Sequence, residues 1–216
     1  MTRKHFWTDP YARTHETRVA SVAGPAITVE STIFYAESGG QESDAGTIGG
    51  RRVLRADKRD RDIVYTLDDA AGLAADDPVT IAIDWERRYK LMRLHLAAEL
   101  VLELVYRALA GVEKTGAHIS ADKARIDFAW PESIAPLLPV LARDAQALID
   151  ADHPIISAYS DEAAERRYWE IEGFARVPCG GTHLRRSGEI GALTLKRDNR
   201  GKGQQRIVIT AEAPEA

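Results

Sequence analysis

In the first 84 residues, hydrophobic positions alternate with polar ones over short stretches. The alternation predicts strands at residues 17–22, 26–29, 51–55, 62–67 and 79–83. Several short strands divided by frequent turn signals are typical of a small barrel or a sandwich. We therefore expect the N-terminal part to be all β.

The spacing changes after Asp84. Apolar residues then recur every three or four positions over residues 85–110, which marks one face of a long helix that ends at Gly111. Helices are also predicted at 131–151 and 161–169, and strands at 117–120, 125–128, 154–159, 190–196 and 205–210. Pro136 and Pro139 weaken the first turns of the second helix. We expect an α+β protein with domains at 1–84 and 85–216 that pack against each other.

The composition is ordinary for a globular protein, with 216 residues, 44% hydrophobic and 29% charged. The sequence has no apolar run long enough to cross a bilayer and no apolar stretch of a secretory signal. One cysteine excludes an internal disulfide and is typical of a reducing compartment. We therefore expect a cytoplasmic protein with no membrane contact, and the sequence implies no stable protein partner.

Basic residues gather near the C-terminus although the net charge is −4. Seven basic residues and two acidic ones lie between positions 185 and 206. The overall charge argues against strong nucleic-acid binding, since phosphate contacts need local positive potential. The segment is either a solvated surface or a local phosphate-binding patch.

His95 and Glu99 are four residues apart on the predicted long helix, so both side chains point the same way. They lie at the edge of its apolar stripe, where a pocket can open, and such a pair can hold a metal ion. The alternative is a histidine with internal partners beside a surface glutamate.

Cys179 and His183 are separated by Gly180, Gly181 and Thr182. The glycines exclude a stable helix and predict a tight turn, in which a thiolate and an imidazole can converge on one ion. The alternative is a buried thiol beside a surface histidine. Zinc prefers such nitrogen and sulfur ligands, and the two pairs together offer four.

An open catalytic zinc site would use His95, Cys179 and His183 with a water. Glu99 is then either the fourth ligand or a general base for that water.

A glycine-rich loop with a polar tip spans residues 38–46. No Gly-Lys-Ser/Thr pattern follows, so the loop is not a phosphate-binding loop. Its backbone amides and the Gln41 side chain can hydrogen-bond a small polar ligand. The alternative is an ordinary turn between strands.

These motifs, in this order, resemble the AlaX family and the editing domain of alanyl-tRNA synthetase. The matching stretches are Thr32–Gln41 with Asp44–Gly46 for the FYPEGGGQ-x-x-D-x-G loop, Arg93–Leu100 for the R-x-H-T-A-x-H-L helix, and Cys179–His183 for C-x-G-T-H. Two weaker blocks match around His118–Phe128 and Glu189–Ile207.

The resemblance implies a small N-terminal glycine-loop β-barrel domain followed by an α+β editing domain. It also implies a hydrolase that acts in trans at a zinc site, where it removes serine or glycine from mischarged tRNA(Ala). Carried over by position, His95, Cys179 and His183 bind the metal, and Gln41 belongs to the site. From the local charge, Arg197, Arg200 and Lys202 are predicted to contact the tRNA acceptor end.

Two positions depart from the family pattern: Glu99 replaces a histidine and Leu96 replaces a threonine. Glutamate can bind zinc, but it adds negative charge and makes the ion a weaker Lewis acid. Leu96 lacks a hydroxyl that could recognise serine, so Thr182 or Gln41 must supply that contact. The departures leave two alternatives, a tRNA- or amino-acid-binding module without hydrolysis and a hydrolase for a different aminoacyl ester.

Overall fold

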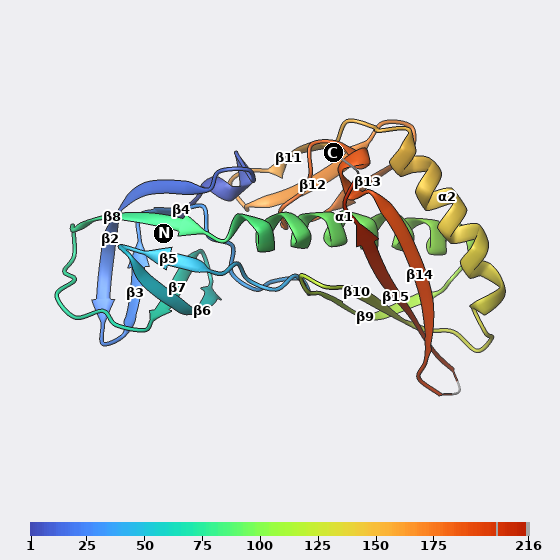
Figure 1. The fold of residues 1–216 in the computed structure, drawn as a ribbon, viewed down its shortest axis with the longest axis horizontal. Coiled ribbons are helices and arrows are strands. Elements are labelled where there is room, and N and C mark those ends of the chain that lie inside the picture. The colour runs from blue at the N-terminus through green and yellow to red at the C-terminus, as the bar shows by residue number, and fades with distance from the viewer. Residues whose placement is uncertain (202, 215–216) are drawn as a thin grey trace. The chain divides into compact units, whose positions relative to one another are not determined.

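The computed structural model describes residues 1–201 and 203–214. They form two compact units, the first made of Met1–Ser38 and Glu42–Tyr89 and the second of Gly39–Gln41 and the chain from Lys90 onward. Strands dominate and α-helices are few, which confirms the predicted α+β class (Figure 1). The division into functional domains 1–84 and 85–216 stays a prediction. None of the helices in the described residues is both long and apolar enough to cross a membrane.

The first unit contains a ring of six paired strands. In pairing order they are β2 (Thr14–Ala23), β3 (Ala26–Val29), β7 (Asp62–Leu67), β6 (Arg51–Arg59), β5 (Gly46–Ile48) and β8 (Pro78–Ile83), and β8 pairs back onto β2. The short strands β1 (Arg3–Lys4) and β4 (Ser31–Thr32) pair in parallel, and a 3₁₀ turn, His5–Trp7, follows β1. Alternate residues of β7 and β8 are buried, as period-two patterning requires. The five strands predicted here are all present.

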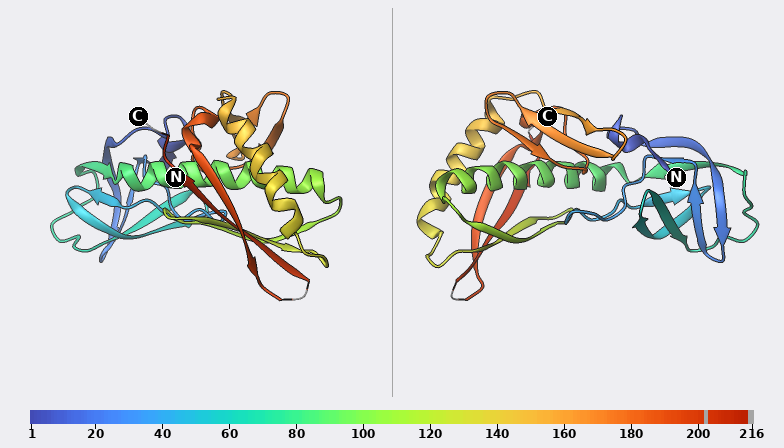
Figure 2. Two further views of the ribbon diagram at one scale, coloured as in Figure 1. Left: turned by 45° about the vertical axis from the view of Figure 1, so that its right-hand side comes forward. Right: turned by 180° about the vertical axis from the view of Figure 1, so that it is seen from behind.

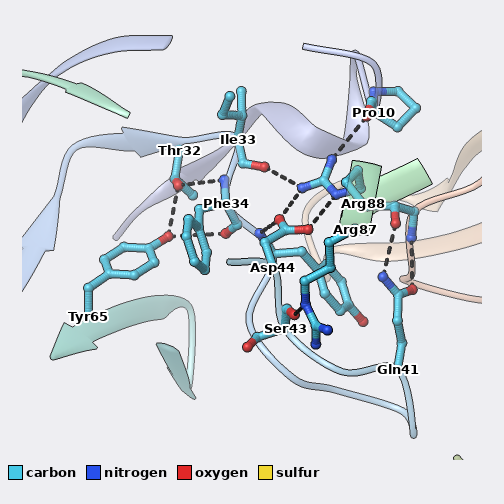
Figure 3. A network of polar contacts seen from close by, with 12 residues as sticks. Pro10, Thr32, Ile33, Phe34, Gln41, Ser43, Asp44, Tyr65, Arg87 and Arg88 are labelled. Carbon is cyan, nitrogen blue, oxygen red and sulfur yellow. Dashed lines mark hydrogen bonds and ion pairs between the residues drawn. The ribbon is translucent and has the colours of Figure 1, made fainter. Parts of the chain in front are cut away.

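A buried ion pair lies in the first unit (Figure 3). Arg88 and Asp44 have no exposed side-chain surface, and Arg88 Nε donates to Asp44 Oδ1 over 2.7 Å. Arg88 also donates to the carbonyls of Pro10 and Ile33, and Asp44 accepts from the backbone N–H of Tyr35. Every charged group of the pair therefore has hydrogen-bond partners, which burial demands.

The second unit has two antiparallel sheets. The four-stranded sheet runs β14 (Ala192–Asn199), β15 (Gln204–Glu212), β10 (Ala124–Ala129) and β9 (Glu113–Ile119). The three-stranded sheet runs β11 (Ile156–Asp161), β12 (Arg166–Ile171) and β13 (Ala175–Pro178). The long helix α1 (Trp85–Ala108) belongs to this unit from Lys90 on, and its chain passes between the two sheets (Figures 1 and 2).

Two predicted helices differ from the structure. The helix expected at 131–151 is shorter: a 3₁₀ turn at Ala135–Leu137 leads into α2 (Leu138–Asp150). Pro136 and Pro139 lie in the first positions of these turns, where a missing N–H does no harm. A further 3₁₀ turn spans Ser187–Ile190.

The prediction of a helix at 161–169 was wrong. Those residues form the last residue of β11, the turn, and the first part of β12 in a β11–β12 hairpin. Glu165 has a left-handed φ of 53°, which no helix tolerates, and the side chains of β12 alternate between buried and more exposed. Helix-forming residues at the tip were overridden by the period-two pattern of the strand that follows.

Candidate metal centre

Four side chains of the second unit converge on one point. His95 Nε2 lies 3.4 Å from Glu99 Oε1 and 3.5 Å from Cys179 Sγ, and Glu99 Oε2 lies 3.1 Å from His183 Nε2. The four ligand atoms all lie within 4.8 Å of one another. Residues 84 positions apart in the chain are thus brought together, as the sequence suggested for these four.

Local structure explains the convergence. His95 and Glu99 are one turn apart on α1, so they share a face. Cys179 follows the last residue of β13, and its N–H donates to the carbonyl of Arg167 on β12 over 2.9 Å. The non-helical segment after Cys179 then returns His183 to the same point, and the rings of His95 and His183 are 5.0 Å apart.

The geometry of this donor set fits a metal ion. Tetrahedral zinc with bonds of about 2.0–2.3 Å separates its ligand atoms by about 3.3–3.8 Å. The separations of 3.1, 3.4 and 3.5 Å in the cluster are close to that range. Two neutral imidazoles, a thiolate and a carboxylate would together balance the charge of a divalent ion.

Gln41 contacts the Nδ1 side of the His95 ring, whereas Glu99 and Cys179 lie on its Nε2 side. The Nδ1 atom of His95 is 2.6 Å from Gln41 Oε1, and Gln41 Nε2 donates to Thr182 Oγ1 over 3.0 Å. The amide oxygen can only accept, so Nδ1 of His95 carries a proton, and the neutral form of the ring presents its lone pair on Nε2. Such an outer partner fixes the tautomer that a metal ligand needs.

The glycine-rich loop reaches this position through backbone pairing. Gln41 forms a parallel bridge with Ile119 of β9, and the Ile119 N–H donates to the Gly40 carbonyl over 2.7 Å. Gly40 has φ 89°, and a Cβ there would lie 2.8 Å from the Ala117 carbonyl oxygen. Gln41 and Thr182 are both buried, so the structure surrounds Gln41 with protein groups.

Gly181 packs directly on the ring of His95. A Cβ built on Gly181 would overlap His95 Cε1, lie 2.6 Å from Nδ1 and lie 2.9 Å from Gln41 Oε1. The φ of Gly181 is not in the left-handed region, so the glycine is needed for space and not for backbone freedom.

Electrostatics in the cluster favour the deprotonated anions. Burial raises the pKa of the Cys179 thiol and Glu99 raises it further, but His95 and His183 outweigh both and bring it down to about 7. Burial also raises the pKa of Glu99, yet the two imidazoles hold it well below its usual value. Burial lowers the pKa of His95, and the charges of Glu99 and Cys179 reverse that effect and leave it raised. The thiolate and carboxylate are the forms that bind metal.

Trp169 is a neighbour of the cluster that sequence reasoning missed. Its ring lies 6.5 Å from that of His183, and its buried indole Nε1 has no hydrogen-bond partner among the described residues. A buried donor without an acceptor is costly, so an acceptor from outside the chain would satisfy it. No sequence pattern marks a tryptophan for this place.

Two of the predicted tRNA-binding residues, Arg197 and Arg200, lie elsewhere in the second unit, around the β14–β15 hairpin. Arg197 Nε donates to Gln205 Oε1 over 3.0 Å, and Arg200 lies 3.7 Å from Asp198. Lys202 lies outside the described residues. Among the residues that are described, no hydrogen bond or ion pair joins Arg197 or Arg200 to the four metal-ligand candidates.

The sequence is similar to known proteins over nearly its whole length, including the segment that carries Cys179 and His183. Residues 168–208 match the family described as the threonyl and alanyl tRNA synthetase second additional domain, and this stretch contains Cys179 and His183. The chain is 35% identical to an alanyl-tRNA editing protein AlaX-M from Pyrococcus horikoshii, over 98% of this chain and 99% of that protein. It is 32% identical to the AlaX-M protein of Methanosarcina barkeri, over 97% and 99%.

Similarity extends to a larger class of enzyme. An alanine–tRNA ligase from Methanococcus aeolicus is 26% identical over 95% of this chain, which corresponds to 25% of the ligase. The chain thus matches full-length editing proteins from end to end and a quarter of a synthetase.

Proposed function

This chain belongs to the AlaX family of alanyl-tRNA editing proteins, and on that premise we propose that it is a trans-acting aminoacyl-tRNA deacylase. Its substrate is mischarged tRNA(Ala), and it cleaves the ester that joins serine or glycine to the terminal ribose. The observation that carries the proposal is the meeting of His95, Glu99, Cys179 and His183 at one point. Because its substrate is aminoacyl-tRNA, we expect it to act in the cytoplasm.

His95, Cys179 and His183 would hold a zinc ion, and Glu99 would complete the set. When bound, zinc supplies a Lewis acid that can polarise the ester carbonyl or a water. If Glu99 is a ligand, the site has two anionic donors and the ion is a weaker Lewis acid than in a site with three histidines. If Glu99 stays outside the ligand set, its low pKa leaves it ionised at neutral pH, where it can accept the proton of the attacking water.

Gln41 is a positioning residue in this scheme. It accepts a hydrogen bond from His95 Nδ1 and so keeps Nε2 turned toward the other ligands. It also holds Thr182 through its amide nitrogen.

Thr182 is the candidate for recognising serine. Its hydroxyl oxygen accepts from Gln41 Nε2, and the hydroxyl proton remains to be donated to one acceptor, such as the hydroxyl oxygen of serine. Leu96, at the position of the family threonine, is fully buried and has no polar group. A site that bonds the serine hydroxyl rejects alanine because alanine leaves the bonding partner unpaired.

Contact with tRNA would come from Arg197, Arg200 and Lys202, where local positive charge is concentrated. We also infer that the first unit is a small β-barrel, because its six strands pair in a closed ring.

The direct test is deacylation by the purified protein of Ser-tRNA(Ala), Gly-tRNA(Ala) and Ala-tRNA(Ala). We expect release of serine or glycine well above the uncatalysed rate, with alanine spared. If the protein released no amino acid faster than the buffer control does, the proposal would be refuted. That result would favour the second candidate, a binding module that has lost hydrolysis. The observation behind that candidate is the departure at Glu99 and Leu96. Release of a different amino acid from a panel of mischarged tRNAs would instead indicate a hydrolase with another aminoacyl ester as substrate.

A further inference from the structure

One row of side chains crosses the three-stranded sheet of the second unit and ends at a metal-ligand candidate. Tyr159 of β11 is paired with Arg167 of β12. The backbone carbonyl of Arg167 accepts a hydrogen bond from the N–H of Cys179, and this bond extends the β12–β13 register by one residue. Directly opposed residues in antiparallel strands project from the same face. Tyr159, Arg167 and Cys179 therefore share one face of this sheet.

The next row on the same face confirms its orientation. Trp169 lies two residues after Arg167 on β12, so it projects to the same side, and its ring is 6.5 Å from that of His183. This face is the one turned toward the cluster. It also carries the buried indole Nε1 without a partner among the described residues.

The outer end of the row is accessible. Tyr159 keeps 36% of its surface exposed, whereas Trp169 and Arg167 are buried. The guanidinium carbon of Arg167 lies 4.4 Å from the centre of the Tyr159 ring, which holds the ring in place by a cation–π contact. A rigid aromatic side chain next to a cation is the usual platform for a nucleobase.

We propose that Tyr159 stacks on the terminal adenine of tRNA and so positions the aminoacyl ester at the metal centre. The proposal rests on the function inferred above and adds the residue that binds the nucleobase. Two strand spacings separate β11 from β13, which is about 10 Å. That length is comparable to a nucleoside, so a base at Tyr159 leaves the ribose ester near Cys179.

The opposite face of the same sheet supplies a matched control. Tyr168 is the neighbour of Arg167 in β12 and projects to the other side, where the Arg176 guanidinium carbon lies 3.7 Å from its ring centre. Tyr168, like Tyr159, is a tyrosine in a cation–π contact with an arginine of this sheet, but it lies on the face turned away from the cluster.

The experiment measures binding of the full-length protein to two uncharged tRNA(Ala) acceptor microhelices, one ending in CCA and one lacking the terminal adenosine. We expect the wild type to bind the complete helix about tenfold more tightly, the size of one base–aromatic stack. Tyr159→Leu should remove that difference, whereas Tyr159→Phe and Tyr168→Leu should keep it. Uncharged RNA is used, so the result does not depend on whether the protein hydrolyses esters.

In the deacylation assay, Tyr159→Leu should raise KM more than it lowers kcat, since the ring touches the base and not the ester. The proposal is overturned if the wild type binds both helices equally, or if Tyr159→Leu and Tyr168→Leu keep the difference to the same extent. A protein that binds both helices equally but still deacylates Ser-tRNA(Ala) would retain the proposed function and lose this inference alone.

Discussion

The Nδ1 atom of His95 lies 2.6 Å from the amide oxygen of Gln41, on the side of the ring opposite Glu99 and Cys179. The glycine-rich loop thus contributes to the cluster by fixing the imidazole of His95. The Gln41 side chain that does so is buried. This places the loop motif and the helix motif in one chemical unit although 54 residues separate them.

Removal of the Gln41 amide should weaken metal binding. Gln41→Ala leaves the His95 Nδ1–H without its acceptor, and loss of such an outer partner typically costs about 10- to 100-fold in metal affinity. Gln41→Glu keeps an acceptor for that proton and should bind zinc more tightly than Gln41→Ala. Zinc titration against a competing chelator measures both variants. Equal affinity of Gln41→Ala and the wild type would mean that Gln41 does not orient His95.

A methyl group at Gly181 should displace the His95 ring. Gly181→Ala puts a Cβ 2.6 Å from His95 Nδ1, which no small adjustment can relieve, so metal content and deacylation should both be lost while the fold persists. Gly116→Ala is the control, because the closest atom to its new Cβ would be Asp127 Oδ2, at 3.3 Å, a contact that a small side-chain shift relieves. Circular dichroism verifies the fold of each variant. Full activity in Gly181→Ala would show that the ring of His95 has room to move without consequence.

Loss of the Arg88 guanidinium should destabilise the first unit. Arg88→Met leaves the Asp44 carboxylate buried without its counter-charge, and breaking a buried pair from one side costs about 3–5 kcal/mol. The double variant Arg88→Met with Asp44→Leu should recover much of that loss, since no charge is then stranded. Urea denaturation gives the free energy of unfolding for each. If the single and double variants were equally unstable, the cost would come from packing and from the backbone groups that lose their partners, and not from the stranded charge.

Charge reversal at the β14–β15 hairpin should weaken tRNA binding at low salt. Arg200→Glu should lower affinity for all tRNA sequences alike and reduce the slope of log K against log salt by about one. Arg143→Glu on α2 is the matched control, since Arg143 is also exposed and also paired with an aspartate. Filter binding across a salt series measures both. The same salt slope for Arg200→Glu and wild type would remove the hairpin from the tRNA-binding surface.

Each pair of metal-ligand candidates was accessible to sequence reasoning because the geometry within a pair is local, whereas the meeting of the two pairs joins residues 84 positions apart. His95 and Glu99 are fixed by the pitch of one helix, and the glycines before His183 mark a turn. The contact between Gln41 and His95 was not accessible in the same way. It depends on a parallel bridge to Ile119, and a pairing between distant residues leaves no periodic trace in the chain.

In the three-stranded sheet the sequence-based prediction failed for two strands, β12 and β13. Helix-forming residues between Asp161 and Glu165 suggested a helix, and the alternation of Arg166–Ile171 was the signal that should have prevailed. Strand β13 was missed altogether because none of its residues is buried and it ends at Pro178, a residue that weakens a strand pattern. The row from Tyr159 to Cys179 could be recognised only after both strands were placed.

Metal content of the purified protein decides whether the four-residue cluster is a metal site. We expect about one zinc per chain in the wild type and almost none in His95→Ala, measured by mass spectrometry of the metal after extensive dialysis. Glu99→Ala should lose metal if the carboxylate is a ligand and keep it if the carboxylate is a base. A wild-type protein without metal that still deacylates Ser-tRNA(Ala), or a His95→Ala variant with its zinc intact, would show that these residues do not form the catalytic metal site.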